Sequence, residues 1–362
     1  MTLIAFSAVA LLATGCATHD PPSLRLGIAY GDRLVRLSDE DLGAALDDAA
    51  EVGVRWVRTD LSWENIQPDG PDEFRWGLFD RVVTAAAERD LEVLPILVST
   101  PRWARPAGCT DEQCRPADPE AFAGFAAAAA SRYAPRGIHT WEVWNEPNLI
   151  NAWKPTPDAT TYTTVLRATS EALRRTDPTS YIILGGLSST DTGGGNLSHT
   201  DFLADVSARD GHRLVDAVGY HPYTYPYLAS AKTSWGTPWE QINRTRDSLR
   251  GVLSAHGTPD LPVWITEFGA PTNGPGTTSD GRPETIGTTT THVTEERQAS
   301  IAADAVRTAA ATPHVGALFW YAARDLGTDT SSNENFYGLR RADGSPKPAL
   351  GVLRRAVAEL RN

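Results

Sequence analysis

Two glutamates stand out in the sequence because each ends a short apolar run. Glu146 follows the run IHTWEVWN at residues 138–145, and Pro147 after it cannot donate a ladder hydrogen bond and biases Glu146 toward an extended conformation. Glu267 ends a second run, LPVWIT, at residues 261–266. Two carboxyl groups that face each other across a cleft suit cleavage of a glycosidic bond, in which one protonates the leaving oxygen and the other attacks the sugar carbon.

The first run also carries a second carboxylate, Glu142. Side chains alternate between the two faces of a strand, so Glu142, Trp144 and Glu146 should share one face and Asn145 should point the other way. Glu142 lies four residues deeper in the strand than Glu146. We expect it to pair with a buried arginine, and a direct part in the chemistry is the alternative.

Eight apolar segments have the length and composition of strands, and each is followed by an amphipathic segment or by a loop that leads into one. The expected strands are residues 26–30, 54–59, 91–98, 138–145, 181–187, 215–221, 262–267 and 315–321. The expected helices are residues 39–52, 74–89, 119–133, 158–175, 200–208, 239–256, 295–311 and 348–360. Ser38 should cap the first helix with Asp41 at the capping-box offset, and Pro119 should open the third.

Regular alternation of strand and helix predicts parallel strands with right-handed crossovers, and eight such units close a barrel. An open doubly wound sheet is the alternative, but residues 27–31, GIAYG, lack the glycine spacing of a phosphate loop after the first strand. We therefore predict an α/β fold, a single-domain (β/α)8 TIM barrel over residues 25–362. Glu146 and Glu267 would then end the fourth and seventh strands and meet at the C-terminal rim, where such barrels carry their active sites.

The two glutamate motifs resemble those of clan A of the glycoside hydrolases. Residues 144–147, WNEP, are similar to the Asn-Glu motif of the clan, and residues 264–269, WITEFG, are similar to its nucleophile strand. The resemblance covers about residues 25–360. It implies a (β/α)8 barrel in which Glu146 is the general acid and base and Glu267 the nucleophile. Two solvated rim glutamates without a role are the alternative.

Further matches make the chain most like family 39, the β-xylosidase and exopolysaccharide-hydrolase group, with family 5 as a neighbour. Residues 55–63, RWVRTDLSW, resemble the second strand, residues 220–223, YHPY, the sixth, and residues 319–321, FWY, the eighth. Residues 335–348 resemble the closing segment of the family. Residues 99–103, STPRW, lack the histidine expected of many family 5 enzymes, which favours family 39.

The resemblance assigns roles to the residues around the pair. Arg58 would hydrogen-bond Glu267 and keep it ionised, and a purely structural ion pair is the alternative. Asn145 would hold a sugar 2-hydroxyl or else simply end its strand. His221 would face the cleft or serve as a wall histidine, and Tyr223 would bond the free oxygen of the nucleophile.

Eleven tryptophans offer flat apolar faces on which sugar rings stack, although core packing is the alternative for each. Those at strand ends or in the following loops are the expected sugar platforms: Trp63, Trp103, Trp153 and Trp320. Among them, Trp320 is expected to form the floor under the reacting sugar. Those inside strands or near helix starts are expected in the core: Trp56, Trp76, Trp141, Trp239 and Trp264.

Net charge limits the choice of partner. A formal charge of −12 and a pI near 5.1 disfavour nucleic acid and anionic membrane surfaces and leave an oligo- or polysaccharide as the expected partner. We find no motif for a cofactor or a metal site, and the oligomeric state stays open. Cys109 and Cys114 bracket a four-residue loop and should form a disulfide in an oxidising compartment, with a metal pair as the alternative.

The N-terminus predicts export. Residues 3–13 form an apolar run too short to span a bilayer, and Cys16 follows it in a pattern that resembles a bacterial lipoprotein signal, although no Lys or Arg precedes the run. We predict a signal peptide at residues 1–15, a tether at residues 16–24 and a lipid anchor at Cys16 as the one link to the cell envelope. Secretion without the anchor is the alternative.

Together these features predict an exported, retaining glycoside hydrolase that cleaves β-linked cell-surface or extracellular polysaccharide. We expect endo action, because several rim loops carry candidate tryptophan platforms. An exo-acting β-xylosidase-like enzyme, a noncatalytic carbohydrate-binding barrel and a structural scaffold in the envelope are the alternatives. The sugar and its linkage stay open.

Overall fold

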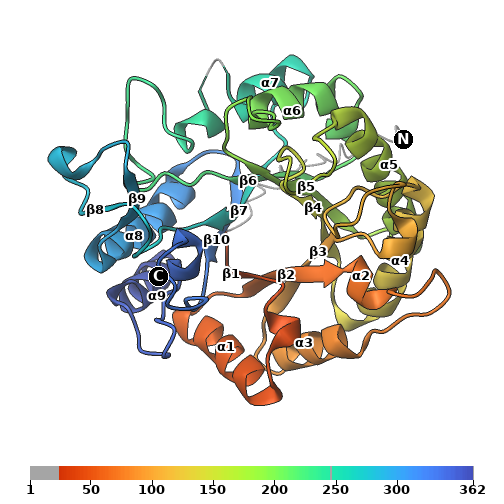
Figure 1. Cartoon of the computed structure of the whole chain (residues 1–362), viewed down its shortest axis with the longest axis horizontal. Helices are drawn as coiled ribbons and strands as arrows, with labels where there is room; N and C mark the ends of the chain where they lie inside the picture. Colours follow the sequence, from red (N-terminus) through yellow and green to blue (C-terminus); the bar gives the residue numbers. More distant parts are fainter. Residues whose placement is uncertain (1–23, 245–246, 362) are drawn as a thin grey trace, which may run out of the picture.

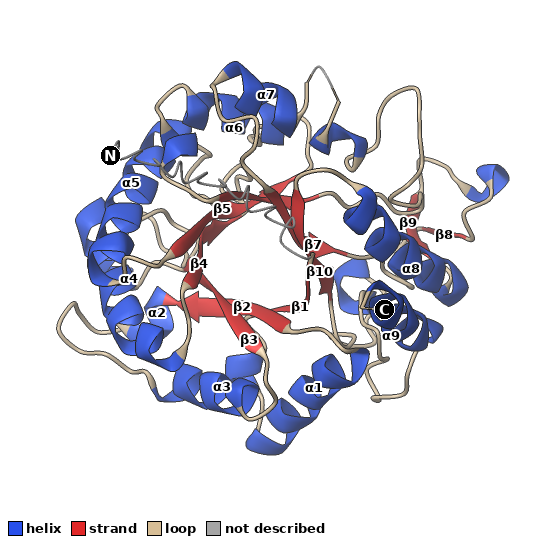
Figure 2. Cartoon of the chain, turned by 180° about the vertical axis from the view of Figure 1, so that it is seen from behind, coloured by secondary structure: helices blue, strands red, loops and turns tan. Residues whose placement is uncertain are grey.

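A computed structural model describes residues 24–244 and 247–361 of the chain. Eight parallel strands close a barrel in the order β1-β10-β7-β6-β5-β4-β3-β2, and helices surround it (Figures 1 and 2). The predicted (β/α)8 barrel is therefore confirmed. Its strands are β1 (Arg25–Gly31), β2 (Trp56–Ser62), β3 (Glu92–Val98), β4 (Thr140–Asn145), β5 (Tyr181–Ser188), β6 (Ala217–His221), β7 (Val263–Phe268) and β10 (Val315–Tyr321).

The helices pack their apolar faces against the outside of the barrel. They are α1 (Asp39–Val52), α2 (Trp63–Ile66), α3 (Gly77–Ala87), α4 (Pro119–Tyr133), α5 (Ala159–Thr176), α6 (His199–Ser207), α7 (Leu249–Ala255), α8 (Glu295–Ala311) and α9 (Pro348–Leu360). The Ser38 hydroxyl accepts a hydrogen bond from the Asp41 amide at the start of α1, as the capping-box spacing predicts. Pro119 opens α4, and the Asp118 side chain caps it.

The predicted helix over residues 239–256 is wrong in its length. The structure has a short 3₁₀ helix, η5 (Glu240–Ile242), and then α7, which begins only at Leu249. Ser248 takes an extended backbone, and its hydroxyl accepts the Gly251 amide, so a new helix starts there. Asn243 and Asp247, which lie between η5 and α7, are poor helix formers.

Two features of the rim loops were not predicted as secondary structure. After β7, the chain forms a small parallel sheet of β8 (Thr277–Ser279) and β9 (Thr290–Val293), which lies outside the barrel beside α8 (Figure 1). The four-residue helix α2 follows β2 directly, and the Ser62 hydroxyl caps it. Both elements sit after a strand, so they build on the C-terminal face of the barrel.

The buried core has two layers. Inside the barrel, apolar residues from alternating strand positions fill the lower end, with Trp56 edge-on to Trp264 and Phe319 stacked on Trp264. A second, larger layer lies between the strands and the helices. Because apolar side chains close the lower lumen, the charged residues of the upper lumen open only toward the C-terminal rim.

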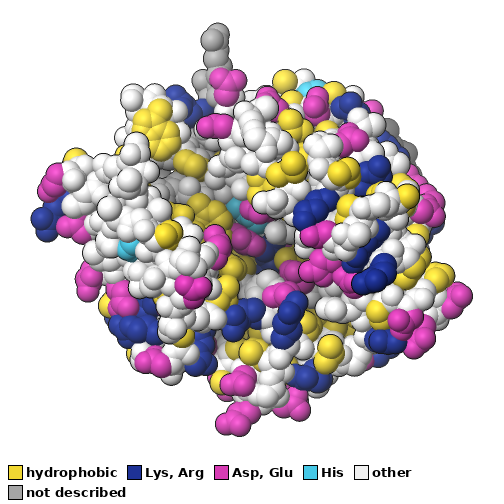
Figure 3. Space-filling model, in the orientation of Figure 1, with side chains coloured by type: hydrophobic (Ala, Val, Ile, Leu, Met, Phe, Trp, Pro, Cys, Tyr) yellow, Lys and Arg dark blue, Asp and Glu magenta, His cyan; other side chains and the backbone are white. Residues whose placement is uncertain are grey.

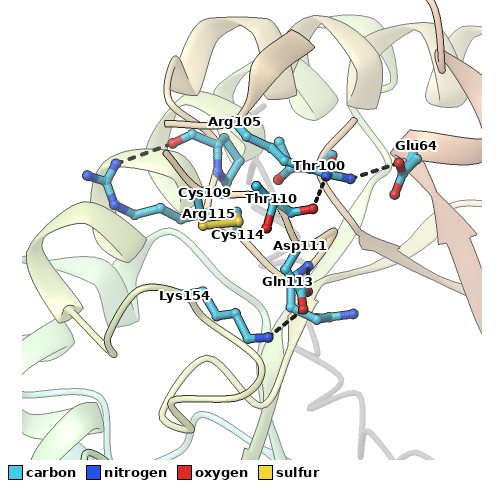
Figure 4. Close-up of a disulfide and its surroundings, with 11 residues drawn as sticks. Glu64, Thr100, Arg105, Cys109, Thr110, Asp111, Gln113, Cys114, Arg115 and Lys154 are labelled. Carbon is cyan, nitrogen blue, oxygen red and sulfur yellow. Dashed lines mark hydrogen bonds and ion pairs between the residues drawn. A yellow bond between two sulfur atoms is a disulfide. The ribbon is translucent and has the colours of Figure 1, made fainter. Parts of the chain in front are cut away.

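Cys109 and Cys114 form the expected disulfide in the loop after β3 (Figure 4). Around it, Lys154 Nζ lies 2.5 Å from Asp111 Oδ2, and Arg105 Nη2 donates to Glu64 Oε1 over 2.7 Å. These contacts tie the loop to its neighbours after β2 and β4. The predicted signal segment at residues 1–15, the lipid candidate Cys16 and all but the last residue of the tether lie outside the described residues. Within the described part, no helix is long and apolar enough to cross a bilayer.

Candidate active site

A cavity of about 820 Å³ opens at the C-terminal end of the barrel. Figure 3 shows the molecule hollowed at its centre, with acidic and histidine side chains around the hollow. Glu146 and Glu267 both line the cavity, and tyrosines, serines and further acids complete its wall. The two ends of β4 and β7 thus contribute to one site, as the barrel topology predicts.

The backbone at the end of β4 departs from a regular strand. Trp144 has φ of 72° and Glu146 has φ of 47°, both in the left-handed region that non-glycine residues rarely adopt. The predicted alternation of side chains along this strand is therefore wrong at Trp144 and Asn145. Trp144 turns outward to pack on Phe122 of α4, whereas Asn145 points inward, where its Oδ1 accepts a hydrogen bond from Arg58 Nη2 over 2.7 Å. Such strained positions often occur at functional sites.

Two glycines of β5 make room for this arrangement. A Cβ on Gly185 would collide with the Trp144 carbonyl oxygen, and a Cβ on Gly186 would collide with His221 Nε2 and lie 2.6 Å from Thr266 Oγ1. The carbonyl of Gly186 accepts the Glu146 amide over 2.9 Å. The Gly-Gly pair therefore lets the bent end of β4 and the His221 ring approach β5 closely.

His221 lies between the two glutamates. Its Nδ1 is 3.0 Å from Glu146 Oε1 and 3.7 Å from Glu267 Oε2, and its Nε2 is 3.0 Å from Thr266 Oγ1. The ring is fully buried, whereas 23% of the Glu146 side chain and 14% of the Glu267 side chain are exposed. A single ring nitrogen of the buried histidine, Nδ1, therefore lies next to both partly exposed carboxylates.

The shared nitrogen limits the separation of the carboxylates. The distance between Oε1 of Glu146 and Oε2 of Glu267 cannot exceed the sum of their distances to His221 Nδ1, which are 3.0 and 3.7 Å. For these two oxygens, the limit lies at the bottom of the range of about 6.5 to 9.5 Å found for inverting glycosidases. It is compatible with the separation of about 5 to 5.5 Å typical of retaining enzymes.

Glu267 is held by charged and polar neighbours on both oxygens. Arg58 Nη1 donates to its Oε1 over 2.6 Å, and the Tyr223 hydroxyl donates to its Oε2 over 2.9 Å. Burial would raise the pKa of Glu267, but His221, Arg58 and the Tyr223 hydroxyl together lower it below the usual value. The group is therefore kept as a carboxylate, which a nucleophile requires.

Arg58 is fully buried and serves more than one partner. Its Nε donates to Glu142 Oε2 over 2.6 Å and its Nη2 donates to Glu142 Oε1 over 3.0 Å. The two roles considered for Arg58, a structural ion pair and a hydrogen bond to Glu267, are therefore both seen in its contacts, because it pairs with Glu142 and also bonds Glu267. Burial would lower the pKa of Arg58, but the charges of Glu142 and Glu267 raise it, so the guanidinium stays charged. The expectation that Glu142 pairs with a buried arginine matches this contact.

The predicted tryptophan platforms are wrong for three of the four residues. Trp63 and Trp153 are fully buried in the layer between strands and helices, where each packs against other aromatic rings. Trp320 is only 3% exposed and packs against Phe268 in that same outer layer. Trp103 is 36% exposed, but it does not line the cavity, and its indole donates to the Gln67 carbonyl oxygen.

Tyrosines take the place of those tryptophans in the cavity. Tyr321 follows Trp320 in β10, and strand alternation turns it toward the lumen instead of its neighbour. The aromatic residues that line the cavity are Tyr223, Tyr225, Tyr321 and Tyr337. Sequence reasoning missed Tyr321 because strand alternation leaves open which of the two neighbours faces the lumen, and only the register that places Phe319 in the lumen decides it.

Sequence reasoning also missed four acids of the cavity: Asp32, Asp60, Glu112 and Glu334. Asp60 lies two residues after Arg58 in β2, so the strand period places it on the same lumen face. Burial and nearby carboxylates raise the pKa of Asp60 to about 7, although Arg58 opposes the shift. Burial and a hydrogen bond with Glu64 raise the pKa of Glu112, and burial together with Glu267 and Glu146 raises that of Glu334.

Metal ligands are a separate question. Among residues 24–244 and 247–361, no group of three or more His, Cys, Asp or Glu side chains is arranged to hold a metal ion.

Residues 32–320 match the model of the family described as cellulase, glycosyl hydrolase family 5. A β-xylosidase from Geobacillus stearothermophilus is 31% identical over 145 residues, which are 38% of this chain and 27% of the β-xylosidase. The match thus spans little more than a quarter of that relative.

Solved structures share the fold. A family 39 glycoside hydrolase from the gut symbiont Bacteroides cellulosilyticus WH2 aligns with a TM-score of 0.69 and 22% identity, over 94% of this chain and 64% of that one. A GH5_18 protein from Streptomyces cattleya, in complex with GlcNAc, aligns with a TM-score of 0.68 and 20% identity, over 95% of this chain and 82% of that one. At these identities the likeness concerns the barrel.

Proposed function

Because the chain belongs to glycosyl hydrolase family 5, the cellulase family of clan A, we propose that it is a retaining glycosidase that cleaves β-linked polysaccharide by double displacement. One observation carries the proposal. Glu146 and Glu267, from the ends of two different strands, lie on the same nitrogen of His221 and line the same cavity. A pair at this spacing can attack and protonate one glycosidic bond.

In the first step Glu267 attacks the anomeric carbon, and the bond between that carbon and the leaving oxygen breaks. Glu146 gives its proton to the leaving oxygen, so the departing chain leaves as a neutral alcohol. Arg58 and Tyr223 hold Glu267 as the carboxylate that attacks. The product of this step is a glycosyl ester on Glu267 and an ionised Glu146.

In the second step Glu146 acts as a base. It takes a proton from a water molecule, whose oxygen attacks the anomeric carbon and displaces Glu267. Two inversions return the original configuration. Asn145, held by Arg58 at the edge of the cavity, is placed to bond a hydroxyl of the reacting sugar.

We propose endo action on an extracellular or cell-surface polysaccharide, after export and with a lipid anchor at Cys16. The size of the cavity supports endo action, because about 820 Å³ lies toward the upper end of the range of about 300 to 1,000 Å³ for small-molecule sites. The tryptophan platforms expected from the sequence do not support endo action, because Trp63, Trp153 and Trp320 are buried. Product lengths from a glycan-library digestion would separate endo action from removal of single terminal sugars.

The decisive experiment compares wild type with Glu146→Gln and Glu267→Gln on aryl β-glycosides and on the glycans found in the library digestion. Each variant should lose at least about 10²-fold in kcat/KM, because each loses a group that acts in the transition state. Glu51→Gln, on the exposed face of α1, is the matched control and should keep full activity.

Two further readouts test the retaining mechanism. Proton NMR during hydrolysis should show the β-anomer as the first product, and a 2-deoxy-2-fluoro glycoside should label Glu267 in a peptide map. An α-anomer, or a Glu267→Gln variant as active as wild type, would overturn the assignment. A protein that binds glycans but cleaves none and takes no label would be a noncatalytic carbohydrate-binding barrel.

A further inference from the structure

The cavity carries more negative charge than the proposed chemistry needs. Among the described lining residues, Arg36 is the one basic side chain. Six carboxylic acids line the cavity: Asp32, Asp60, Glu112, Glu146, Glu267 and Glu334. Some of this charge is compensated within the protein. Arg36 pairs with Asp32, and Arg58 pairs with Glu267 from below. Burial and Glu64 raise the pKa of Glu112, which favours its neutral form.

Asp60 and Glu334 differ from Asp32, Glu146 and Glu267, each of which contacts a basic side chain. Over residues 24–244 and 247–361, neither side chain has a hydrogen-bond donor or a cation in direct contact, although Arg58 is near Asp60 in β2. Asp60 is half-buried and Glu334 is exposed, and both lie in the wall of the cavity. They come from β2 and from the loop after β10, so the fold brings them to the cleft separately.

Like charges surround both groups. Asp60 faces Asp32, Glu142 and Glu267 as well as Arg58, and these neighbours and burial raise its pKa to about 7. Glu334 faces Glu267 and Glu146, and its pKa is raised by burial and by those two charges. A carboxylate that lies next to other carboxylates and has no cation in contact is unfavourable unless it takes up a proton or a cation.

We infer, on the basis of the proposed function, that the substrate is a glycan with free amino groups, whose ammonium groups bind Asp60 and Glu334. The ligand of this cavity is a sugar chain because the Glu146 and Glu267 pair lies there, so the open question is its charge. An ammonium group offers three donors and a positive charge to carboxylates that lack both. A neutral hydroxyl would leave the like-charge repulsion in place.

The same charges discriminate against other glycans. Uronic acids and sulfated or phosphorylated sugars would add a negative charge to a cavity that already has an excess of it. An N-acetyl group offers one N–H donor but no positive charge, so it would leave the excess negative charge in place. The inferred substrate class is therefore a β-linked polymer that contains de-N-acetylated hexosamine units.

Binding should release protons, which a neutral ligand would not cause. An ammonium next to Asp60 favours its charged form, so the proton that Asp60 holds near neutral pH leaves when the amino glycan binds. Isothermal titration at pH 5.5, where the amino groups of the glycan are already largely charged and Asp60 still holds its proton, reports this release in two buffers of different ionisation enthalpy. The glucosamine hexamer should show it and cellohexaose should not.

The test uses three hexamers and the full-length Glu146→Gln protein, which binds without turnover. The β-1,4-glucosamine hexamer and cellohexaose share one backbone and differ in an amino group at each C2, and the β-1,4-glucuronate hexamer supplies the anionic case on the same backbone. At low salt the glucosamine hexamer should bind about tenfold or more tightly than cellohexaose, and the glucuronate hexamer should bind the weakest. Its advantage should shrink as salt is added.

Variants assign the preference to residues. Asp60→Asn and Glu334→Gln, each added to the Glu146→Gln protein, should lower affinity for the glucosamine hexamer about fivefold or more and change cellohexaose less than twofold. Asp72→Asn, an exposed acid outside the cavity, is the control and should change neither. Glu334 lies on a loop, so its variant keeps the test valid if Asp60→Asn fails to fold.

The results separate the two proposals. A glucosamine hexamer that binds no more tightly than cellohexaose, or variants that weaken both hexamers equally, would overturn the inferred substrate class. Hydrolysis of a neutral glycan by wild type would then leave the proposed function intact. Absence of any hydrolysis and of any label on Glu267 would overturn the proposed function instead, whatever the binding preference.

Discussion

Arg58 and Glu142 form a two-contact ion pair in which neither side chain is exposed to solvent. The Gly186 amide donates to Glu142 Oε1 over 2.8 Å, so the carboxylate is further fixed by the backbone of β5. Glu142 does not line the cavity. It therefore acts through Arg58, whose Nη1 and Nη2 reach Glu267 and Asn145.

Glu142→Gln should lower stability strongly, because it leaves the buried Arg58 with too little negative charge. Breaking a buried pair by removing one partner costs about 3 to 5 kcal/mol. Urea unfolding should show a loss in that range, and kcat/KM should fall because Arg58 is free to shift. Glu51→Gln removes an exposed partner of Arg354 and should cost about 0 to 1 kcal/mol. Equal losses in the two variants would contradict the role of Glu142.

Tyr223→Phe should move the acid limb of the pH profile of kcat/KM to higher pH. The Tyr223 hydroxyl helps to lower the pKa of Glu267, so its loss raises that pKa. Glu267 must be ionised to attack, and activity is therefore lost at a higher pH as the solution is acidified. Tyr227→Phe, which changes a tyrosine of the same loop that does not line the cavity, should leave the profile in place. An unshifted acid limb in Tyr223→Phe would count against the contact.

Gly186→Ala should reduce activity while the barrel stays folded. The new Cβ would collide with His221 Nε2, and moving this ring displaces the nitrogen on which both glutamates rest. Misplacement of a catalytic group by about 1 Å can cost about 10²-fold in rate. Steady-state kinetics and circular dichroism would measure the two effects.

Gly124→Ala is the matched control for that substitution. Gly124 lies in α4, and a Cβ there meets nothing within 4 Å. It should keep full activity and gain about 0.4 to 1 kcal/mol of stability from the lower entropy of the unfolded chain. A Gly186→Ala protein as active as this control would show that His221 tolerates the shift.

Asp60→Asn should change the pH dependence of stability. The folded pKa of Asp60 is raised to about 7, so the folded state binds a proton that the unfolded state has already lost between about pH 4 and 7. Wild-type stability attributable to Asp60 therefore falls as pH rises through that window. Urea midpoints at pH 5 and pH 8 should favour the variant more at pH 8, and the reverse order would contradict the raised pKa.

Removal of the disulfide should weaken substrate binding more than folding. The Cys109–Cys114 bond closes a loop of only a few residues, so its entropic contribution is smaller than the roughly 3 kcal/mol of a 15-residue loop. Glu112 and Gln113 lie inside that loop and line the cavity. A variant with both cysteines replaced by serine should raise KM several-fold and leave kcat within about twofold, and unchanged KM would show that the loop is held by its other contacts.

Local patterns predicted most of the fold. Helices α1, α4, α8 and α9 have the bounds expected from caps and apolar spacing, and each barrel strand overlaps its predicted segment. The family model confirms the resemblance to clan A. The long helix expected over residues 239–256 failed because Ser248 starts a new helix, a choice that apolar periodicity does not report.

Errors in the site came from the direction in which side chains point. Trp320 and Tyr321 are neighbours, and only the register of β10 within the closed barrel decides that the tyrosine faces the lumen. At Trp144 the left-handed backbone breaks the alternation and turns Asn145 inward. Tryptophans in loops after strands were expected to meet solvent, but Trp63 and Trp153 fill space between helices and strands.

The sequence by itself determined the eight strand–helix units and the ends of β4 and β7 as the places for Glu146 and Glu267, because these depend on local periodicity and on Pro147. Only the tertiary structure decided which charged side chains contact one another. Arg58, Glu142, His221 and Glu267 come from four strands, and closure of the barrel sets the distances between them, which no local pattern contains. Among the described residues, closure also leaves Asp60 and Glu334 in the cavity wall without a cation in contact.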